Sequence, residues 1–326
     1  MDSHTPLWRK VLRQNFTSVQ ELAAFLEISH LLDKLHLKPE FILNLPRRLA
    51  TKIEKGTLTD PLFLQFVPLQ RETEIHPGFC EDPVHDAQFV KEGSLLQKYR
   101  ARVLLITTSA CAMHCRYCFR KNFEYETKER SFTKELDSIR NDPSIEEVIL
   151  SGGDPLSLGD KELEKLLKEL EKIPHIQRIR FHTRFPMGIP ERIDASFLSL
   201  LENVHKQCIF VIHANHPREF DADIWHALKK LQRLGIPLLC QTVLLRGVND
   251  QVAVAQELFS LLVNHGVMPY YLHQLDRVQG ASHFEVSKEE GLQIINTLQT
   301  SLPGYAIPRY VQELPGKEGK ISLNQN

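Results

Sequence analysis

The stretch Arg102-Val-Leu-Leu-Ile-Thr107, followed by Cys111-Ala-Met-His-Cys115-Arg-Tyr-Cys118, decides how the rest of the chain is interpreted. The first part is a short apolar run of the kind that forms a buried strand. The second part places three cysteines on the segment that directly follows it. A buried strand followed by a loop rich in potential ligands predicts a site at the carboxyl end of that strand.

Five similar apolar runs follow, and helix-like segments alternate with them. The runs are 147–151, 176–183, 208–213, 236–245 and 267–273, and the helix-like segments are 133–140, 160–172, 195–204, 221–234, 251–265 and 288–302. Buried strands that alternate with amphipathic helices indicate parallel βα units. We therefore expect the α/β class, with a partial (β/α)6 barrel of the TIM type. Periodicity alone leaves a doubly wound sheet open.

The remaining segments give three expected regions. Residues 1–98 are expected to form a helical and wrapping N-terminal region, with apolar helical spacing at 19–26 and 27–37. Residues 99–302 are expected to form the barrel. Residues 303–326 form a short C-terminal segment, which contains a strand-like run at 305–311.

Composition excludes several classes of function. Forty Lys and Arg residues against 41 Asp and Glu give a net charge of -1, which is not the basic footprint of a nucleic-acid-binding protein. This charge also provides no general attraction to an anionic membrane. No apolar run approaches the length of a membrane-spanning helix, and the first twenty residues do not resemble a secretory signal. We therefore expect a cytoplasmic protein whose six cysteines serve metal binding or catalysis rather than disulfides.

The cysteine triad is the strongest chemical signal in the sequence. Thiolates of Cys111, Cys115 and Cys118 on one loop can converge on one inorganic centre, and a [4Fe–4S] cluster normally takes four thiolates. Three thiolates leave one iron open to a further ligand. The alternatives are a structural zinc ion with a fourth ligand such as His114, or three buried thiols without a ligand.

A glycine-rich turn, Ser151-Gly152-Gly153-Asp154, ends the second predicted strand. Paired glycines allow a close backbone approach and can expose N–H groups, which suits a ligand with an amino-acid moiety. Taken alone, the same residues are also typical of an ordinary tight turn.

Together these motifs resemble the radical S-adenosylmethionine superfamily, in which a CxxxCxxC motif follows the first barrel strand. Strings from about residue 60 to the C-terminus narrow the resemblance to the lysine 2,3-aminomutase family; they include Asn215-His-Pro217, Leu244-Leu-Arg-Gly-Val-Asn-Asp250, Pro269-Tyr-Tyr271 and Gly304-Tyr-Ala-Ile-Pro308. The resemblance implies a [4Fe–4S] cluster held by the triad and S-adenosylmethionine held by the glycine-rich turn, His213 and Gln241.

The resemblance also implies pyridoxal phosphate near the C-terminus. Lys320 in Gly316-Lys-Glu-Gly-Lys320 aligns with the family lysine that forms the Schiff base with this cofactor. In this chain Lys317 and Glu318 interrupt the glycine-rich run usual in the family, so Lys317 is a weaker rival. Arg102 aligns with an arginine that contacts the cofactor phosphate.

Three further positions imply the substrate L-lysine. Arg120 aligns with the arginine that pairs with the substrate carboxylate, for which a planar guanidinium is well suited. Asp276 and Glu313 align with the two acids that hold the lysine ε-ammonium, although Glu313 replaces the more usual Asp. The implied activity is that of an isomerase, which moves an amino group between neighbouring carbons.

The chain also resembles one branch of that family. It has Gln251 where zinc-binding relatives carry a cysteine, and no cysteine-rich tail is present. This short form resembles the bacterial aminomutases that supply (R)-β-lysine for modification of elongation factor P. That branch implies a functional link to elongation factor P and its lysyl ligase, and a reductant such as flavodoxin or ferredoxin. The alternatives are a catabolic lysine or arginine 2,3-aminomutase and a non-enzymatic iron–sulfur or zinc protein.

Overall fold

A single large sheet organises the protein in the computed structural model, which describes residues 5–123, 131–317 and 319–324. Six parallel strands stand next to one another in chain order: β3 (Arg102–Thr108), β4 (Glu147–Gly152), β5 (Arg178–Thr183), β6 (Gln207–His213), β7 (Leu238–Val243) and β8 (Met268–His273). Each lies within or close to an apolar run identified in the sequence. The expected partial (β/α)6 barrel is confirmed.

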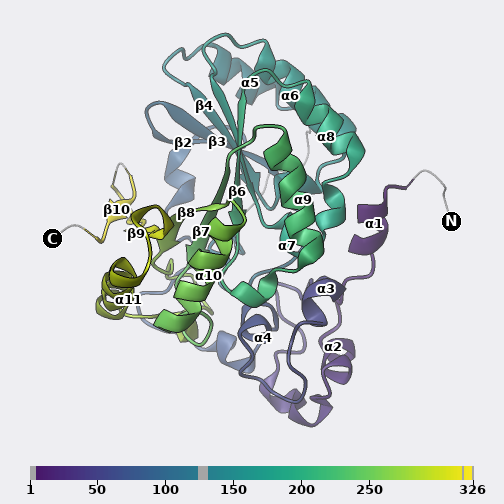
Figure 1. The fold of residues 1–326 in the computed structure, drawn as a ribbon, viewed down its shortest axis with the longest axis vertical. Coiled ribbons are helices and arrows are strands. Elements are labelled where there is room, and N and C mark those ends of the chain that lie inside the picture. The colour runs from purple at the N-terminus through teal and green to yellow at the C-terminus, as the bar shows by residue number, and fades with distance from the viewer. Residues whose placement is uncertain (1–4, 124–130, 318, 325–326) are drawn as a thin grey trace.

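Helices connect these strands and lie outside the sheet (Figure 1). The crossover helices are α5 (Thr133–Arg140), α6 (Asp160–Glu171), α8 (Ala195–Glu202), α9 (Ala222–Arg233) and α10 (Val252–Asn264), and α11 (Lys288–Ser301) follows β8. Acidic or hydroxyl side chains begin several of them: Asp221 accepts a hydrogen bond from Ile224 N, and Ser287 accepts one from Glu290 N. The apolar stripes of the helices cover the sheet, and a short helix, α7 (Phe185–Gly188), follows β5 directly.

The sheet extends beyond the six strands on both sides. β2 (Leu95–Tyr99) adds antiparallel to β3, and β1 (Val90–Glu92) adds antiparallel to β2. On the other side β9 (Arg309–Gln312) adds parallel to β8, and β10 (Ile321–Ser322) adds antiparallel to β9. β1 and most of β2 lie in the region 1–98 that we expected to be helical and irregular, so that expectation is wrong for the strand residues between 90 and 98. The strand expected at 305–311 begins only at Arg309, after a 3₁₀ turn at Gly304–Ala306.

The N-terminal region packs against one end of the barrel (Figure 1). Its helices are α1 (Leu7–Leu12), α2 (Val19–Phe25), α3 (Arg47–Ala50) and α4 (Pro61–Phe66). The helical segment expected at 27–37 is instead a 3₁₀ helix at Ser29–Lys34, because Glu27 adopts a positive φ of 60° and ends α2. Trp8 packs edge-on against Phe185 of α7, so the hydrophobic core of the barrel continues into this region.

Candidate active site

A cavity of about 280 Å³ opens at the carboxyl ends of the parallel strands. Every site residue expected from the sequence lines it: Arg102, Cys111, Cys115, Cys118, Arg120, Ser151, Gly152, Gly153, Asp154, His213, Gln241, Asp276, Glu313 and Lys320. Cys80, Cys208 and Cys240 are not among the lining residues. The predicted constellation therefore surrounds one space, although its members span more than 200 positions of sequence.

The cysteine loop is fastened by the N-terminal region. The Asn44 side chain donates to the Cys111 carbonyl at 3.1 Å, and Asn15 donates to the Ala112 carbonyl at 2.8 Å and to Asn44 Oδ1 at 2.7 Å. The His114 amide donates to the Asn44 carbonyl at 2.9 Å. Residues for which the sequence indicated no chemistry thus fix the backbone that carries the triad.

Two of the three thiols, those of Cys111 and Cys118, lie in an environment that disfavours isolated thiolates. Burial, followed by repulsion from Cys115, raises the pKa of Cys118 to about 11, and burial also raises the pKa of Cys111 well above its usual value. Within the described ranges, no three Cys, His, Asp or Glu side chains already stand in a metal-binding arrangement. Cys111, Cys115 and Cys118 share a loop and a cavity, and a cationic centre would favour the thiolates of Cys111 and Cys118.

His114 does not supply the fourth ligand of a zinc site in this arrangement. Its Nδ1 lies 2.8 Å from the Ile42 carbonyl oxygen, and its ring stacks on Phe41 with centroids 4.5 Å apart. The side chain is also absent from the cavity lining. This geometry favours three ligands and an open position over a closed tetrahedral site.

The glycine-rich turn packs directly against the cysteine loop. A Cβ on Gly153 would lie 2.4 Å from the Ala110 carbonyl oxygen, and a Cβ on Gly152, whose φ is 115°, would lie 2.6 Å from that of Thr108. The Gly153 and Asp154 amides donate to these same two carbonyls at 2.7 and 2.8 Å. The expected close approach is correct, but these two N–H groups are used by the protein rather than exposed.

Asp154 organises the scaffold beneath this turn. Its carboxylate accepts hydrogen bonds from the Thr183 hydroxyl and from the backbone amides of Leu156, Arg184 and Phe185, at 2.7 to 3.0 Å. Burial raises its pKa to about 6 against these hydrogen bonds, which lower it. The Asp154 side chain therefore links the end of β4 to the end of β5.

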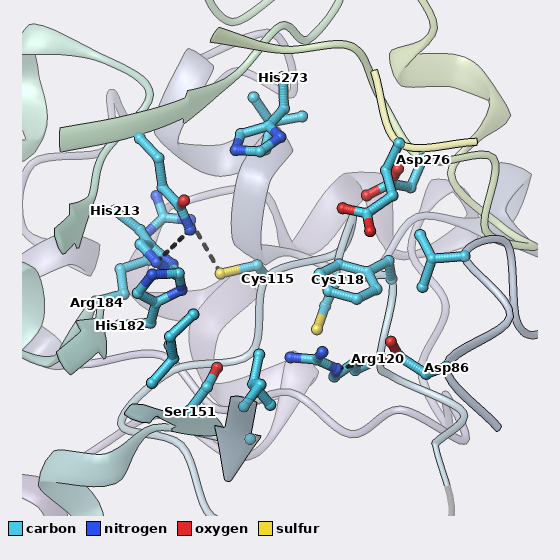
Figure 2. Close-up of a pocket in the computed structure, with 18 of the residues that line it drawn as sticks. Asp86, Cys115, Cys118, Arg120, Ser151, His182, Arg184, His213, His273 and Asp276 are labelled. Atoms are coloured by element: carbon cyan, nitrogen blue, oxygen red, sulfur yellow. Dashed lines mark hydrogen bonds and ion pairs between the residues drawn. The ribbon is translucent and has the colours of Figure 1, made fainter. Parts of the chain in front are cut away.

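His213 and Gln241 face each other across neighbouring strands. They are register partners in β6 and β7, and the Gln241 side-chain amide lies 2.6 Å from His213 Nε2. Burial, and then the positive charge of Arg184, lower the pKa of His213 to about 3. The pair therefore presents a neutral polar surface to the cavity, and Figure 2 shows His213 on the side of Cys115.

Lys320 meets Glu313 because of a hairpin. β10 pairs with β9 so that Ile321 lies opposite Gln312, which brings the two neighbouring side chains together. Lys320 Nζ lies 2.6 Å from Glu313 Oε2, and Lys98 Nζ lies 2.8 Å from Glu313 Oε1. Burial lowers the pKa of Lys320, but the charge and hydrogen bond of Glu313, together with Tyr99 and Asp276, outweigh it, so the pKa is raised. Lys317 is exposed and does not line the cavity, and Glu318 lies outside the described residues.

Asp276 lies on the loop after β8, near this ion pair. Burial, together with repulsion from Glu313, raises its pKa to about 7. Burial raises the pKa of Glu313, but Lys320 and Lys98 both lower it, and the result is a pKa of about 2. Near neutral pH this side of the cavity therefore holds one firmly ionised carboxylate and one that is close to its titration point.

The two arginines expected from the sequence also have partners. Arg120 Nε donates to Asp86 Oδ2 at 2.6 Å, and Figure 2 shows both residues on the same side of the cavity as Asp276. The Arg102 guanidinium lies 3.6 Å from the centre of the Tyr99 ring, whose hydroxyl accepts a hydrogen bond from the Lys320 amide at 3.1 Å. Tyr99 thus contacts both the side chain of Arg102 and the backbone of Lys320.

Sequence reasoning missed several lining residues, among them Asp86, Lys98, His182, Arg184 and His273. His273 ends β8 and His182 is the penultimate residue of β5, so the rule that strand ends carry chemistry could have found both. Asp86 and Lys98 come from the N-terminal region, where no motif pointed to them. Arg184 follows β5 immediately and reaches back to Cys115.

The comparisons with known proteins agree with this geometry. Residues 105–258 match the radical SAM superfamily. The chain is 44% identical to the L-lysine 2,3-aminomutase of Haemophilus influenzae, over 86% of this chain and 84% of that protein, and 41% identical to that of Escherichia coli, over 97% and 94%. A radical SAM methyltransferase from Sphaerobacter thermophilus has a TM-score of 0.48 at 18% identity, over 67% of this chain and 68% of that one.

Fold and site thus define a radical SAM enzyme. The chain belongs to the L-lysine 2,3-aminomutase family, whose members are isomerases. Membership implies a [4Fe–4S] cluster, S-adenosylmethionine and pyridoxal phosphate. The residues present fit these groups: three thiols line the cavity, and one of them, Cys115, contacts the cationic Arg184. The neutral polar pair His213 and Gln241, the partly buried amine of Lys320 and Arg102 line the same cavity. No helix in the described part of the chain is long and apolar enough to cross a membrane.

Proposed function

We propose that this enzyme converts L-α-lysine to (R)-β-lysine and that the product modifies elongation factor P. The observation that carries the proposal is the pairing of acids and an amine, Asp276, Glu313 and Lys320, in the cavity that also contains the cysteine triad. Carboxylates that are partly buried, as these two are, favour a cationic partner. L-lysine has a cationic end for the acids and a carboxylate for Arg120.

In this proposal Cys111, Cys115 and Cys118 hold the cluster, and Ser151, His213 and Gln241 contact S-adenosylmethionine. Lys320 carries pyridoxal phosphate and Arg102 binds its phosphate. When bound, these groups supply radical generation and electron delocalisation. The protein itself fixes the substrate at both ends, which places Cα and Cβ within the shielded cavity between them.

Lys320 and Glu313 connect cofactor attachment to substrate binding. Glu313 holds the Lys320 ammonium at 2.6 Å. Because Lys320 must lose ammonium protons to carry the cofactor, Glu313 then has an oxygen available for a second ammonium. Asp276, which has no other cation bound to it among the described ion pairs, completes that position. The same two acids therefore serve the enzyme lysine first and the substrate lysine afterwards.

The proposal includes a setting for the reaction. The reductant is a one-electron donor such as flavodoxin or ferredoxin, and the enzyme works in the cytoplasm with the lysyl ligase that uses its product. The close similarity to the short aminomutases of Haemophilus influenzae and Escherichia coli supports this branch over a catabolic lysine or arginine 2,3-aminomutase. The cavity beside the triad argues against a simple electron carrier.

Anaerobic turnover tests the proposal. Reduced, cluster-loaded enzyme with S-adenosylmethionine and pyridoxal phosphate should convert L-lysine to β-lysine, and chiral chromatography should give the (R) form. L-Arginine serves as the competing substrate, and its kcat/KM should be lower. Absence of β-lysine from enzyme of full iron content, or a preference for arginine, would contradict the proposed substrate.

A further inference from the structure

Arg184 is a buried cation that contacts the cysteine loop and has no role in the proposed reaction. It follows β5, and its side chain is only 7% exposed. One terminal nitrogen of its guanidinium lies 2.9 Å from Cys115 Sγ, and Figure 2 shows the side chain pointing at that sulfur. We propose that Arg184 acts through Cys115 to raise the reduction potential of the iron–sulfur cluster. This inference rests on the proposed ligation of the cluster by the three cysteines.

The contact is built into the fold rather than accidental. The other terminal nitrogen of Arg184 donates to Glu219 Oε2 and to Gln65 Oε1, both at 2.7 Å. Glu219 is fully buried, and its second oxygen accepts the backbone amides of Asn215 and His216 at 2.8 and 3.1 Å. The Arg184 amide is itself held by Asp154 at 2.7 Å. The guanidinium is therefore fixed from both ends.

Two aromatic rings complete the enclosure. The guanidinium lies 4.8 Å from the centre of the Phe66 ring and 5.7 Å from that of Tyr117, and it also contacts the Tyr117 hydroxyl. Its Nε is buried without a hydrogen-bond partner among the described residues. One N–H donor of Arg184 is therefore left over on a side chain that already touches a cluster ligand. Such a donor suits an inorganic sulfide or a carboxylate.

The chemistry sets the direction of the effect. Reduction adds one electron to the cluster from the protein donor, or from dithionite in vitro, and no bond forms or breaks. The added negative charge is stabilised by a nearby cation and by N–H donors to sulfur, and hydrogen bonds to the sulfurs are a recognised determinant of cluster potential. In a water-poor interior this stabilisation is larger than at a surface. Removal of Arg184 must therefore make the cluster harder to reduce.

The alternative is that Arg184 only packs the interior of the barrel, and a variant of Arg192 is the control for that alternative. Arg192 is also completely buried in the barrel, donates to the carbonyls of Leu156 and Leu158, and pairs with Asp160 at 2.9 Å. Among the described residues the other contacts of its side chain are with the rings of Trp8 and Phe197, and none is with the cysteine loop. Arg192→Gln thus removes a buried guanidinium of equal size and charge without touching a cluster ligand.

The test is a potentiometric titration of the reconstituted full-length holoenzyme, followed by the electron paramagnetic resonance signal of the reduced cluster. In Arg184→Gln the equilibrium constant for reduction should fall about tenfold, which is about 59 mV for one electron. Arg184→Lys keeps the charge but cannot reach all the hydrogen-bond partners of the guanidinium. The reduction potential of its cluster should therefore lie between those of the wild type and of Arg184→Gln. Arg192→Gln should keep the wild-type potential. An unchanged potential in both Arg184 variants, or an equal fall in Arg192→Gln, would overturn the proposal.

A second measurement is made on the wild-type enzyme, so it does not depend on whether an Arg184 variant folds. Wild-type enzyme labelled with guanidino-¹⁵N arginine should show nitrogen coupling to the reduced cluster in electron–nuclear double resonance, and labelled Arg184→Lys should lose it. Absence of that coupling overturns the Arg184 contact and leaves the proposed function intact. Absence of iron from the wild-type protein overturns the cluster assignment itself, and both proposals with it.

Discussion

The cavity has two sides that are built in different ways. On the cysteine side, the positions of Cys115 and its neighbours are set by backbone: the glycine-rich turn hydrogen-bonds to Thr108 and Ala110, and Asn44 holds the Cys111 carbonyl. On the opposite side, the β9–β10 hairpin brings Lys320 and Glu313 together and charge then holds them, because the two form an ion pair and Asp276 lies near it. Figure 2 shows Arg184 and His213 on the first side and Asp276 on the second.

This difference teaches which side tolerates change. A position fixed by backbone depends on shape, so even one Cβ at Gly153 would collide with the cysteine loop. A side chain held by an ion pair depends instead on the balance of positive and negative charges around it. Lys98, Lys320, Glu313 and an ionised Asp276 balance one another, and removal of one of them changes what the other three attract. Substitutions on the charged side should therefore alter ligand binding while the cysteine side remains intact.

The largest expected effect comes from Lys320→Ala. The variant should lose all turnover and the borohydride-reducible pyridoxal phosphate adduct, because the buried amine that Glu313 holds is gone. Iron content and the absorbance of the cluster should be unchanged, since the cysteine side is built separately. Mass spectrometry of the reduced wild-type adduct locates the modified residue. Lys317→Ala, at an exposed position, is the matched control. An adduct at Lys98 or Lys317 would contradict the assignment.

The two sides also differ in how far the sequence predicts them. The triad is local, so its spacing alone indicated an inorganic centre, and the six strands were visible as apolar runs. The glycine-rich turn was identified only together with the triad, because by itself it is also typical of an ordinary tight turn. The charged side was identified only through resemblance, because Asp276 and Glu313 are isolated acids in the sequence. Their meeting depends on the β9–β10 hairpin register.

The unpredicted contacts have a common cause. The ion pair of Asp86 with Arg120 and the hydrogen bonds from Asn15 and Asn44 join positions dozens of residues apart. Neither periodicity nor a motif encodes such pairs, which depend on how the N-terminal region packs on the barrel. The missed strands β1 and β2 have the same origin, because both are short and form by pairing, β2 with β3 and β1 with β2.

Asp276→Asn should have an intermediate effect on the charged side only. Loss of one carboxylate should raise the KM for L-lysine about tenfold, or about 1.4 kcal/mol, with little change in kcat. In the wild type the KM should fall as the pH rises from 6 to 8, because the pKa of Asp276 is about 7 and only its ionised form attracts an ammonium. The variant should lack that pH dependence.

The control for Asp276 is Glu285→Gln. This carboxylate follows β8 on the same loop but pairs with Arg277 at 2.6 Å outside the cavity lining. Its variant should keep the wild-type KM and pH profile. A pH profile that persists in Asp276→Asn would assign the titration to another group and refute Asp276 as the ammonium partner.

The smallest effect is expected from Asn44→Ala, which acts on the cysteine side only. The variant loses the hydrogen bond to the Cys111 carbonyl and the one from Asn15, each worth about 1 kcal/mol. The cysteine loop should open more often, so iron should pass to a chelator a few times faster, whereas the KM for L-lysine should not change. Asn203→Ala removes a comparable hydrogen bond to the Ser199 carbonyl on α8 and serves as the control. Equal rates of iron loss in the two variants would show that the N-terminal region does not hold the loop, and a raised KM in Asn44→Ala would show that the two sides are not independent.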